Sequence, residues 1–172
     1  MEFKAWPKIP RLENTNWTIT EKIDGTNACI IISDDGTEIA AQSRTRLITP
    51  DNDNAGFARW VQENKEDLLT LGPGHHFGEW WGAGIQRRYD LNEKRFSLFN
   101  TYRWKDNRPS CCYVVPTLAY DIHYHDLLRT IEKCYEQLLF EGSLAAPGYK
   151  NPEGLIIYES TLKIYFKDII NK

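Results

Sequence analysis

Apolar and polar positions alternate over most of the chain, which is typical of β-strands that are buried on one face. Strand structure is expected over 17–33 and 37–43, because the turn residues Asp34, Asp35 and Gly36 lie between them and an Asp-Gly pair favours a tight hairpin. Further strands are expected at 75–81, 95–104, 112–121, 154–160 and 162–168. The chain is therefore rich in short strands, most of them suited to antiparallel pairing.

Two stretches carry a helical pattern instead. After Pro50, the residues Phe57, Val61 and Leu68 share one helical face, and the Gly-Pro-Gly sequence at 72–74 ends that segment. A second amphipathic helix is expected to place these residues in the core: Leu127, Leu128, Ile131, Cys134, Leu138 and Leu139. Strands with a few helices between them predict an α+β fold, with antiparallel sheets and flanking helices packed outside.

The length of 172 residues and the absence of repeats or a long linker predict a single domain over residues 1–172. No apolar stretch is long enough to span a membrane, and the N-terminal sequence has no signal-peptide core. Two of the four cysteines, Cys111 and Cys112, are adjacent, which suits reduced thiols better than a disulfide framework. A cytoplasmic protein is expected.

Charge is unevenly distributed along the chain. The net charge of the whole sequence is −3, but Arg87–Arg108 holds seven basic residues against three acidic ones, a local charge of +4. A basic patch on an acidic protein suits a partner that carries phosphate groups. A solvated run of surface charges is the alternative, and charge alone does not separate the two.

The stretch EKIDGTN at 21–27 places a lysine between two expected strands. Lys22 is followed by Asp24 and Gly25, with apolar runs on both sides. A lysine in open water is almost entirely protonated at neutral pH, whereas burial or a nearby cation favours the neutral, nucleophilic amine. Lys22 at the edge of a cleft lined by sheets is therefore a candidate nucleophile. A surface turn is the simpler interpretation of K-x-D-G taken alone.

Four later motifs carry candidate functional residues, and each also has a purely structural interpretation. Glu79 in FGEWWG could be a paired core carboxylate, and Phe99 in SLFNTY could belong to the core. Glu153 in NPEGLIIY could simply begin a strand, and Lys167 in YFKD could be a solvated edge residue. Their order and spacing in the chain make the set more informative than any single member.

This series resembles, in sequence order, the motifs of the covalent nucleotidyltransferases, which are ligases and capping enzymes that work through a lysyl-nucleotide. The resemblance spans nearly the whole chain: EKIDGTN, SRTR at 43–46, FGEWWG, RFSLFN, PEGLIIY and YFK. DNA ligases and capping enzymes usually have an arginine two residues after the motif glycine, where this chain has Asn27. The K-x-D-G-T-N form is similar to phage-type RNA ligases, so the resemblance implies the catalytic (adenylation) domain of an ATP-dependent RNA ligase.

The resemblance implies a reaction and its central residues. Lys22 would attack the α-phosphate of ATP, expel pyrophosphate and hold AMP, which then passes to an RNA 5′-phosphate before that end is joined to a 3′-OH. Asp24 and Glu153 would hold Mg²⁺ or Mn²⁺, largely through waters. Lys167 would contact the α-phosphate.

The resemblance also implies the nucleotide contacts. Glu79 would bind a ribose hydroxyl, Phe99 would stack on adenine, and Glu21 would contact the adenine amino group. Asn27 and an arginine would engage the sugar or the incoming 5′-phosphate. That arginine is Arg44, with Arg46 as the alternative. The expected RNA contacts lie in the basic segment: Arg87, Arg88, Arg103 and Lys105.

Two features depart from the family pattern. The last motif usually has two lysines one residue apart, but position 165 is Tyr165, which leaves Lys163 as the candidate for the second charge. The family's C-terminal accessory domain is not expected here, so either another chain supplies it or a minimal enzyme works without it. The alternatives to an RNA ligase are a non-catalytic nucleotide or nucleic-acid binding module and a DNA ligase or capping-type enzyme.

Overall fold

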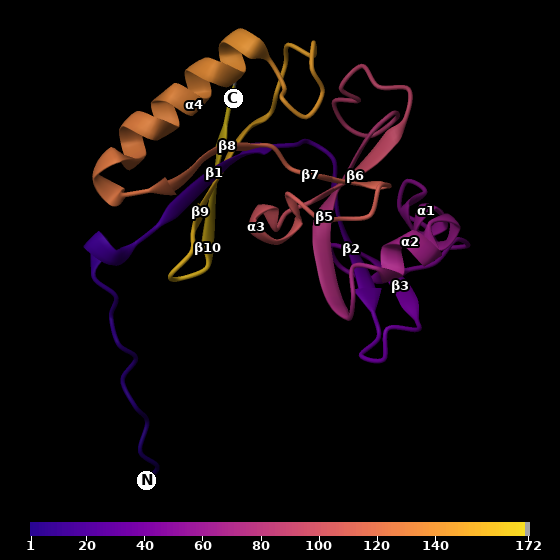
Figure 1. The fold of residues 1–172 in the computed structure, drawn as a ribbon, viewed down its shortest axis with the longest axis horizontal. Helices are drawn as coiled ribbons and strands as arrows, with labels where there is room; N and C mark the ends of the chain where they lie inside the picture. Colours follow the sequence, from indigo (N-terminus) through magenta and orange to yellow (C-terminus); the bar gives the residue numbers. More distant parts are fainter. Residues whose placement is uncertain (171–172) are drawn as a thin grey trace.

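The computed structural model describes residues 1–170 and contains two β-sheets joined by short connections (Figure 1). The first sheet has four antiparallel strands in the order β10-β9-β1-β8. Its strands are β1 (Trp17–Lys22), β8 (Thr117–Ile122), β9 (Gly154–Glu159) and β10 (Ile164–Ile169). Residues 1–11, before β1, are extended and exposed.

The second sheet has six strands in the order β4-β3-β2-β5-β6-β7. All neighbours are antiparallel except β6 and β7, which are parallel. Its strands are β2 (Thr26–Ile32), β3 (Ile39–Ser43), β4 (Leu47–Ile48), β5 (Gly74–Gly82), β6 (Lys94–Leu98) and β7 (Cys112–Val114). Two mostly antiparallel sheets with a few helices confirm the expected α+β class.

The helices cover one face of each sheet (Figure 1). Phe57 and Val61 of α1 and Leu68 of α2 are buried against the six-stranded sheet, together with Trp80 and Phe96. On the other sheet, α4 buries Cys134 and Leu138 against strand residues that include Ile19, Leu155 and Ile157. The helices are α1 (Phe57–Glu63), α2 (Lys65–Leu69), α3 (Thr101–Trp104) and α4 (Leu127–Glu141), with 3₁₀ turns η1 (Leu12–Asn14) and η2 (Tyr124–Asp126). Within residues 1–170, no helix combines the length and apolar character needed to cross a membrane.

The chain passes between the two sheets at two places. Residues 23–25 connect β1 to β2, and residues 115–116 connect β7 to β8. The expected strands at 17–33 and 112–121 are therefore each two strands in different sheets, because Gly25 and Pro116 interrupt the pairing. A third buried cluster surrounds these crossings: Ile23, Trp81, Tyr89, Val115 and Ala146. Lys22, the last residue of β1, lies directly at one crossing.

The strand expected at 95–104 is shorter than its apolar pattern suggested. β6 ends at Leu98, and Thr101–Trp104 forms the short helix α3. The Asn100 side chain caps this helix by accepting a hydrogen bond from the Arg103 backbone N–H at 3.0 Å. An Asn side chain offers the backbone this alternative to a strand ladder, and alternation of residue types does not detect it.

The two helical stretches also differ in detail from the expectation. The segment after Pro50 breaks at Asn64 into α1 and α2. The second helix is confirmed as α4, but Leu128 and Leu139 are 75% and 60% exposed rather than part of the core. The buried stripe of a helix on a flat sheet is narrow, so apolar residues at its margin face solvent.

Alternation along the strands assigns the site residues to the faces that the helices leave uncovered. On β1, Ile19 and Glu21 point toward α4, so Thr20 and Lys22 lie on the opposite face. In the six-stranded sheet, Asn27 is directly opposite Glu79, on the face away from α1. Lys22, Asn27 and Glu79 thus lie on the faces that the helices leave uncovered.

Candidate active site

Lys22 and Glu153 form an ion pair at the end of β1. The Lys22 ammonium donates a hydrogen bond to Glu153 Oε2 at 2.5 Å, and the two side chains are 20% and 14% exposed. Glu153 reaches this position because the next residue, Gly154, pairs with Lys22 in the β1–β9 ladder. Two residues that lie 131 positions apart are therefore brought together by strand pairing.

Gly25 explains why the lysine motif contains a glycine. A Cβ added there would collide with the Trp80 carbonyl oxygen and would lie 2.7 Å from the Trp81 Cβ. Any larger residue would push the connection away from β5. Close contact between this connection and β5 therefore requires glycine.

Glu79 holds the lysine motif from the adjacent sheet. Its carboxylate accepts hydrogen bonds from the Gly25 backbone N–H and the Asn27 Nδ2, both at 3.1 Å. Burial raises the pKa of Glu79 to about 7, although the nearby charge of Lys22 and these two hydrogen bonds act in the opposite direction. The Glu79 carboxyl group therefore titrates near pH 7, and its charge interacts with that of Lys22.

Asp24 is held in place by the loop between β5 and β6, a contact that the sequence did not predict. Arg87 Nε donates to Asp24 Oδ2 at 3.0 Å, and Arg87 Nη1 also donates to the Asn151 carbonyl at 3.2 Å. The Asp24 backbone N–H donates to the Tyr89 hydroxyl at 2.7 Å. Tyr89 is 1% exposed, and its ring packs edge-on against Trp81 at 4.9 Å.

Sequence reasoning gave Arg87 a role in RNA binding and gave Tyr89 none. The structure itself marks this loop, since Arg88, Tyr89 and Asp90 all have positive φ angles. Three consecutive left-handed non-glycine residues persist only where surrounding contacts hold them, and functional sites are common examples.

Glu21 faces the opposite side of the sheet from Lys22. Its carboxylate accepts hydrogen bonds from Ser143 Oγ at 2.6 Å and from the Leu144 and Ala145 backbone N–H groups at 2.8 and 2.9 Å. Glu21 is 1% exposed, and burial raises its pKa despite these bonds. The side chain that was expected to contact adenine therefore fastens the loop between α4 and β9, the loop that ends at Glu153.

Lys167 lies on the same face of the four-stranded sheet as Lys22. In the ladders, Lys167 pairs with Ile156 of β9, which pairs with Thr20 of β1, two residues before Lys22. Lys167 is exposed. The register therefore places its side chain two strands across from the nucleophile and on the correct face.

Tyr165 stands where the family usually has its second motif lysine, and it is part of an aromatic pair. Tyr165 shares the face of Lys167 and stacks on Tyr158 with ring centroids 4.5 Å apart. Lys163 lies in the turn before β10 with a φ of 55°. Lys163 therefore does not belong to the strand that carries Lys167.

Phe99 and Arg44 remain accessible on the six-stranded sheet. Phe99 is 40% exposed, and its backbone N–H donates to the Phe77 carbonyl at 3.0 Å just beyond the end of β6. Arg44 follows β3, is exposed, and has no hydrogen bond within the described residues. The Arg46 guanidinium instead donates to the carbonyls of residues 52 and 53 at 2.9 and 3.3 Å. Arg44 is thus the arginine that is free to meet a ligand.

A family model described as RNA ligase matches residues 15–167. The chain belongs to the RNA ligase family. No curated protein matches the sequence. Among solved structures, the chain is similar to RNA ligase variants from Naegleria gruberi.

A glutamate variant of that RNA ligase with ATP and Mn has a TM-score of 0.65 and 24% identity, over 93% of this chain and 51% of that chain. A lysine variant with AMP and Mn has a TM-score of 0.60 and 20% identity, over 92% of this chain and 50% of that chain. This RNA ligase family member therefore spans about half the length of the solved structures that it matches. At this level of identity the likeness establishes the fold, which this chain shares with these RNA ligase structures.

The basic segment of this RNA ligase family member is divided between two places. Arg87 and Arg88 lie in the loop that connects β5 to β6, whereas Arg103 and Lys105 follow β6 at the opposite end of the same hairpin. Arg103 packs over the Trp104 ring at 4.3 Å and donates to the Leu71 carbonyl at 3.1 Å. The segment is therefore not one continuous patch, because the hairpin places its two halves at opposite ends.

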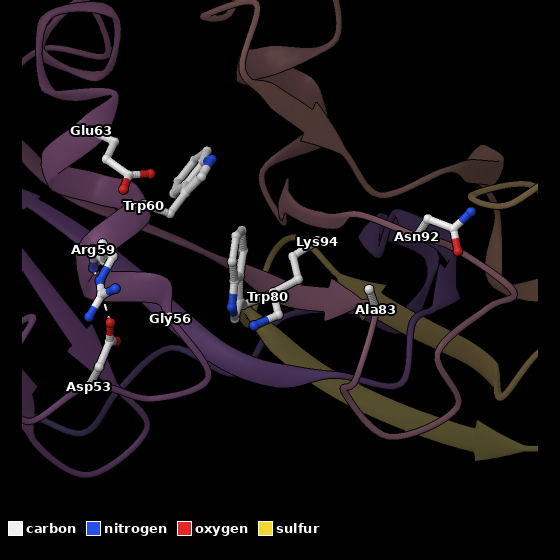
Figure 2. Close-up of a pocket in the computed structure, with 9 residues that line it drawn as sticks. All are labelled: Asp53, Gly56, Arg59, Trp60, Glu63, Trp80, Ala83, Asn92 and Lys94. Carbon is white, nitrogen blue, oxygen red and sulfur yellow. Dashed lines mark hydrogen bonds between the residues drawn. The ribbon is translucent and has the colours of Figure 1, made fainter.

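A cavity of about 600 Å³ lies apart from the predicted site (Figure 2). It is on the α1 side of the six-stranded sheet, where Trp60, Trp80 and Lys94 surround it. None of the predicted catalytic or nucleotide-binding residues lines it. The candidate site at the sheet crossing is therefore distinct from this cavity.

The oxygen ligands at the crossing suit a hard divalent cation bound mainly through water. Asp24 and Glu153 supply carboxylates, which Mg²⁺ prefers, and Mg²⁺ commonly keeps several waters and substrate phosphate oxygens as ligands. Within residues 1–170, no three His, Cys, Asp or Glu side chains come together as a ready-made metal cage. The residues fit an ion shared with a bound nucleotide better than a site made by protein alone.

Proposed function

We propose that the domain is an ATP-dependent RNA ligase that acts through a covalent AMP on Lys22. The observation that carries the proposal is the Lys22–Glu153 ion pair at the sheet crossing, with Glu79 bonded to the same connection from the other sheet. A lysine that is only part of a solvated surface does not require these contacts. A nucleophile that must be held in a fixed position does require them.

In the first step, the neutral Lys22 amine attacks the α-phosphorus of ATP. A P–N bond forms, the bond from the α-phosphorus to the bridging oxygen breaks, and pyrophosphate leaves. The ion pair must open first and the ammonium must lose its proton to solvent, because a protonated amine has no lone pair and Glu153 must stay ionised to hold a cation. A divalent cation held by Asp24 and Glu153 would offset negative charge on the phosphates.

In the later steps, the AMP leaves Lys22. A 5′-phosphate oxygen of RNA attacks the phosphorus, the P–N bond breaks, and the amine takes up a proton. The 3′-OH of the other RNA end then attacks the activated 5′-phosphate, AMP is released, and a phosphodiester is formed. Lys167 would offset charge on the transferring phosphate, and its position on the same face as Lys22 supports this role.

The nucleotide would be held mainly by the free face of the six-stranded sheet. Phe99 stacks on adenine, Glu79 accepts from a ribose hydroxyl, and Asn27 and Arg44 contact the sugar or the 5′-phosphate. The accessibility of Phe99 and the free guanidinium of Arg44 support these assignments. The Glu21 side chain and Lys163 lie away from this group, so any contact by them needs a rearrangement.

Intact-mass spectrometry tests the proposal directly. The protein is incubated with ATP and Mg²⁺ or Mn²⁺, and an increase by one adenylate is expected in the wild type but not in Lys22→Ala. GTP and a DNA substrate in parallel separate an RNA ligase from a capping enzyme or a DNA ligase. ATP binding with no mass increase under either metal ion would contradict the proposal and indicate a non-catalytic binding module.

A further inference from the structure

The α3 end of the six-stranded sheet carries an unusual concentration of accessible aromatic side chains. Tyr102 of α3 is 90% exposed, Phe77 of β5 is 53% exposed, and His75 is also exposed. The His75 and Phe77 rings stack with centroids 6.0 Å apart and planes 17° apart. We call Tyr102, Phe77 and His75 the aromatic surface.

Two hydrogen bonds hold the segment that leads into α3, and α3 itself, next to the start of β5. The Phe99 N–H donates to the Phe77 carbonyl at 3.0 Å, and α3 begins two residues later at Thr101. Arg103 of α3 donates to the Leu71 carbonyl at 3.1 Å, three residues before β5 begins. Figure 1 shows α3 on the side of the six-stranded sheet toward β9 and β10.

This surface lies next to the proposed nucleotide site without being part of it. Phe77 and Glu79 are two residues apart on β5 and point to the same face, so they are separated by about 7 Å along the strand. His75 lies the same distance further on. An RNA strand whose 5′ end reaches Lys22 could therefore continue across the rings of Phe77 and His75.

A lysine follows Tyr102 by three residues, a spacing that places two side chains on the same face of a helix. Lys105, at the end of α3, is exposed and forms no ion pair within residues 1–170. Accessible aromatic rings beside unpaired cationic side chains are the combination that binds single-stranded nucleic acid, through base stacking and phosphate contacts. A protein partner would account for the apolar rings but not for the unpaired lysine beside them.

We propose that the aromatic surface, with Lys105, binds the bases and backbone of the RNA strand near the end to be joined. This rests on the proposed ligase function, and it assigns to Tyr102 and Phe77 a role in holding the substrate. Tyr102 is the central residue, because a 90% exposed tyrosine contributes little to the core and its ring is free to stack.

Fluorescence anisotropy with a labelled, 5′-phosphorylated single-stranded RNA tests the surface. Tyr102→Ala should weaken binding about 5- to 150-fold, whereas Tyr102→Phe, which keeps the ring, should bind nearly as the wild type. Lys105→Gln should reduce the slope of log affinity against log salt by about 0.7. Phe140→Ala, which removes an 85% exposed aromatic ring from α4, is the matched control and should have no effect.

Two results would overturn the proposal. One is unchanged RNA affinity in Tyr102→Ala, which would leave the surface to some other partner. The other is loss of AMP attachment in that variant with RNA affinity retained, which would assign the ring to the nucleotide. RNA binding is measured on protein without AMP, so a wild type that never takes up AMP would contradict the ligase proposal while leaving this test valid.

Discussion

The Lys22 ammonium donates a hydrogen bond to Glu153 Oε2 at 2.5 Å, and both side chains are largely buried. This ion pair keeps the proposed nucleophile in position but in its protonated, unreactive form. Nucleotide binding must therefore separate the two charges before the amine can attack. The pair marks a resting state whose opening is part of the proposed reaction.

Replacement of Lys22 by alanine should abolish AMP attachment, because Lys22 is the only side-chain amine in the motif. The variant leaves Glu153 without its partner, so some loss of stability is expected, and circular dichroism should confirm that the variant is folded. Lys8→Ala, on the exposed N-terminal segment, is the control and should label normally with α-labelled ATP. A folded Lys22→Ala protein that still takes up label would exclude Lys22 as the attachment site.

Phe99→Leu should weaken ATP binding by about 1–3 kcal/mol through the loss of base stacking. The melting temperature should hardly change, because Phe99 is 40% exposed. Both quantities are measured on the same variant, with Phe140→Leu on α4 as the control. A fall in stability with unchanged ATP affinity would show that Phe99 serves the core instead.

Glu79→Gln should change how stability depends on pH. The pKa of Glu79 is raised to about 7, so the folded protein keeps this proton at pH values where the unfolded chain, with a pKa of 4.5, has lost it. Wild-type stability should therefore fall as pH rises from about 4.5 to 7, by about 3 kcal/mol relative to Glu79→Gln. Above pH 7 the two curves should run parallel.

Urea unfolding of both proteins at several pH values measures this difference. Glutamine retains an acceptor for the Gly25 N–H, and the Asn27 amide can rotate to accept from the new NH₂ group. Curves that stay parallel between pH 4.5 and 7 would show that Glu79 is ionised normally.

Arg87→Ala should slow AMP attachment by roughly 10- to 100-fold, because Arg87 positions Asp24 and small displacements at a reaction centre are costly. This differs from an RNA contact, whose loss would leave AMP attachment intact. Arg88 in the same loop is exposed and forms no ion pair within the described residues, so Arg88→Glu is the sharper test of RNA binding there. Single-turnover labelling with ATP, with Arg59→Ala on α1 as the control, distinguishes the two roles. Normal labelling in Arg87→Ala would return Arg87 to the RNA-binding group.

The sequence alone determined the class of the fold and the family, and it predicted the central site residues. Strand alternation, the Asp-Gly hairpin and the amphipathic stripe of α4 depend on interactions within a few residues, so they can be recognised locally. The motif order likewise predicted roles for Lys22, Glu79, Glu153 and Lys167, and the family model confirmed membership of the RNA ligase family.

Only the tertiary structure decided which partners these residues have. Glu21 is bonded to a loop more than 120 positions away, and Arg87 reaches Asp24 across 63 positions. The basic segment, continuous in sequence, is separated because the β5–β6 hairpin carries its halves to opposite ends. Residue type and spacing report chemistry and local geometry. Long-range strand pairing and burial decide whether a charged side chain contacts a ligand or another side chain.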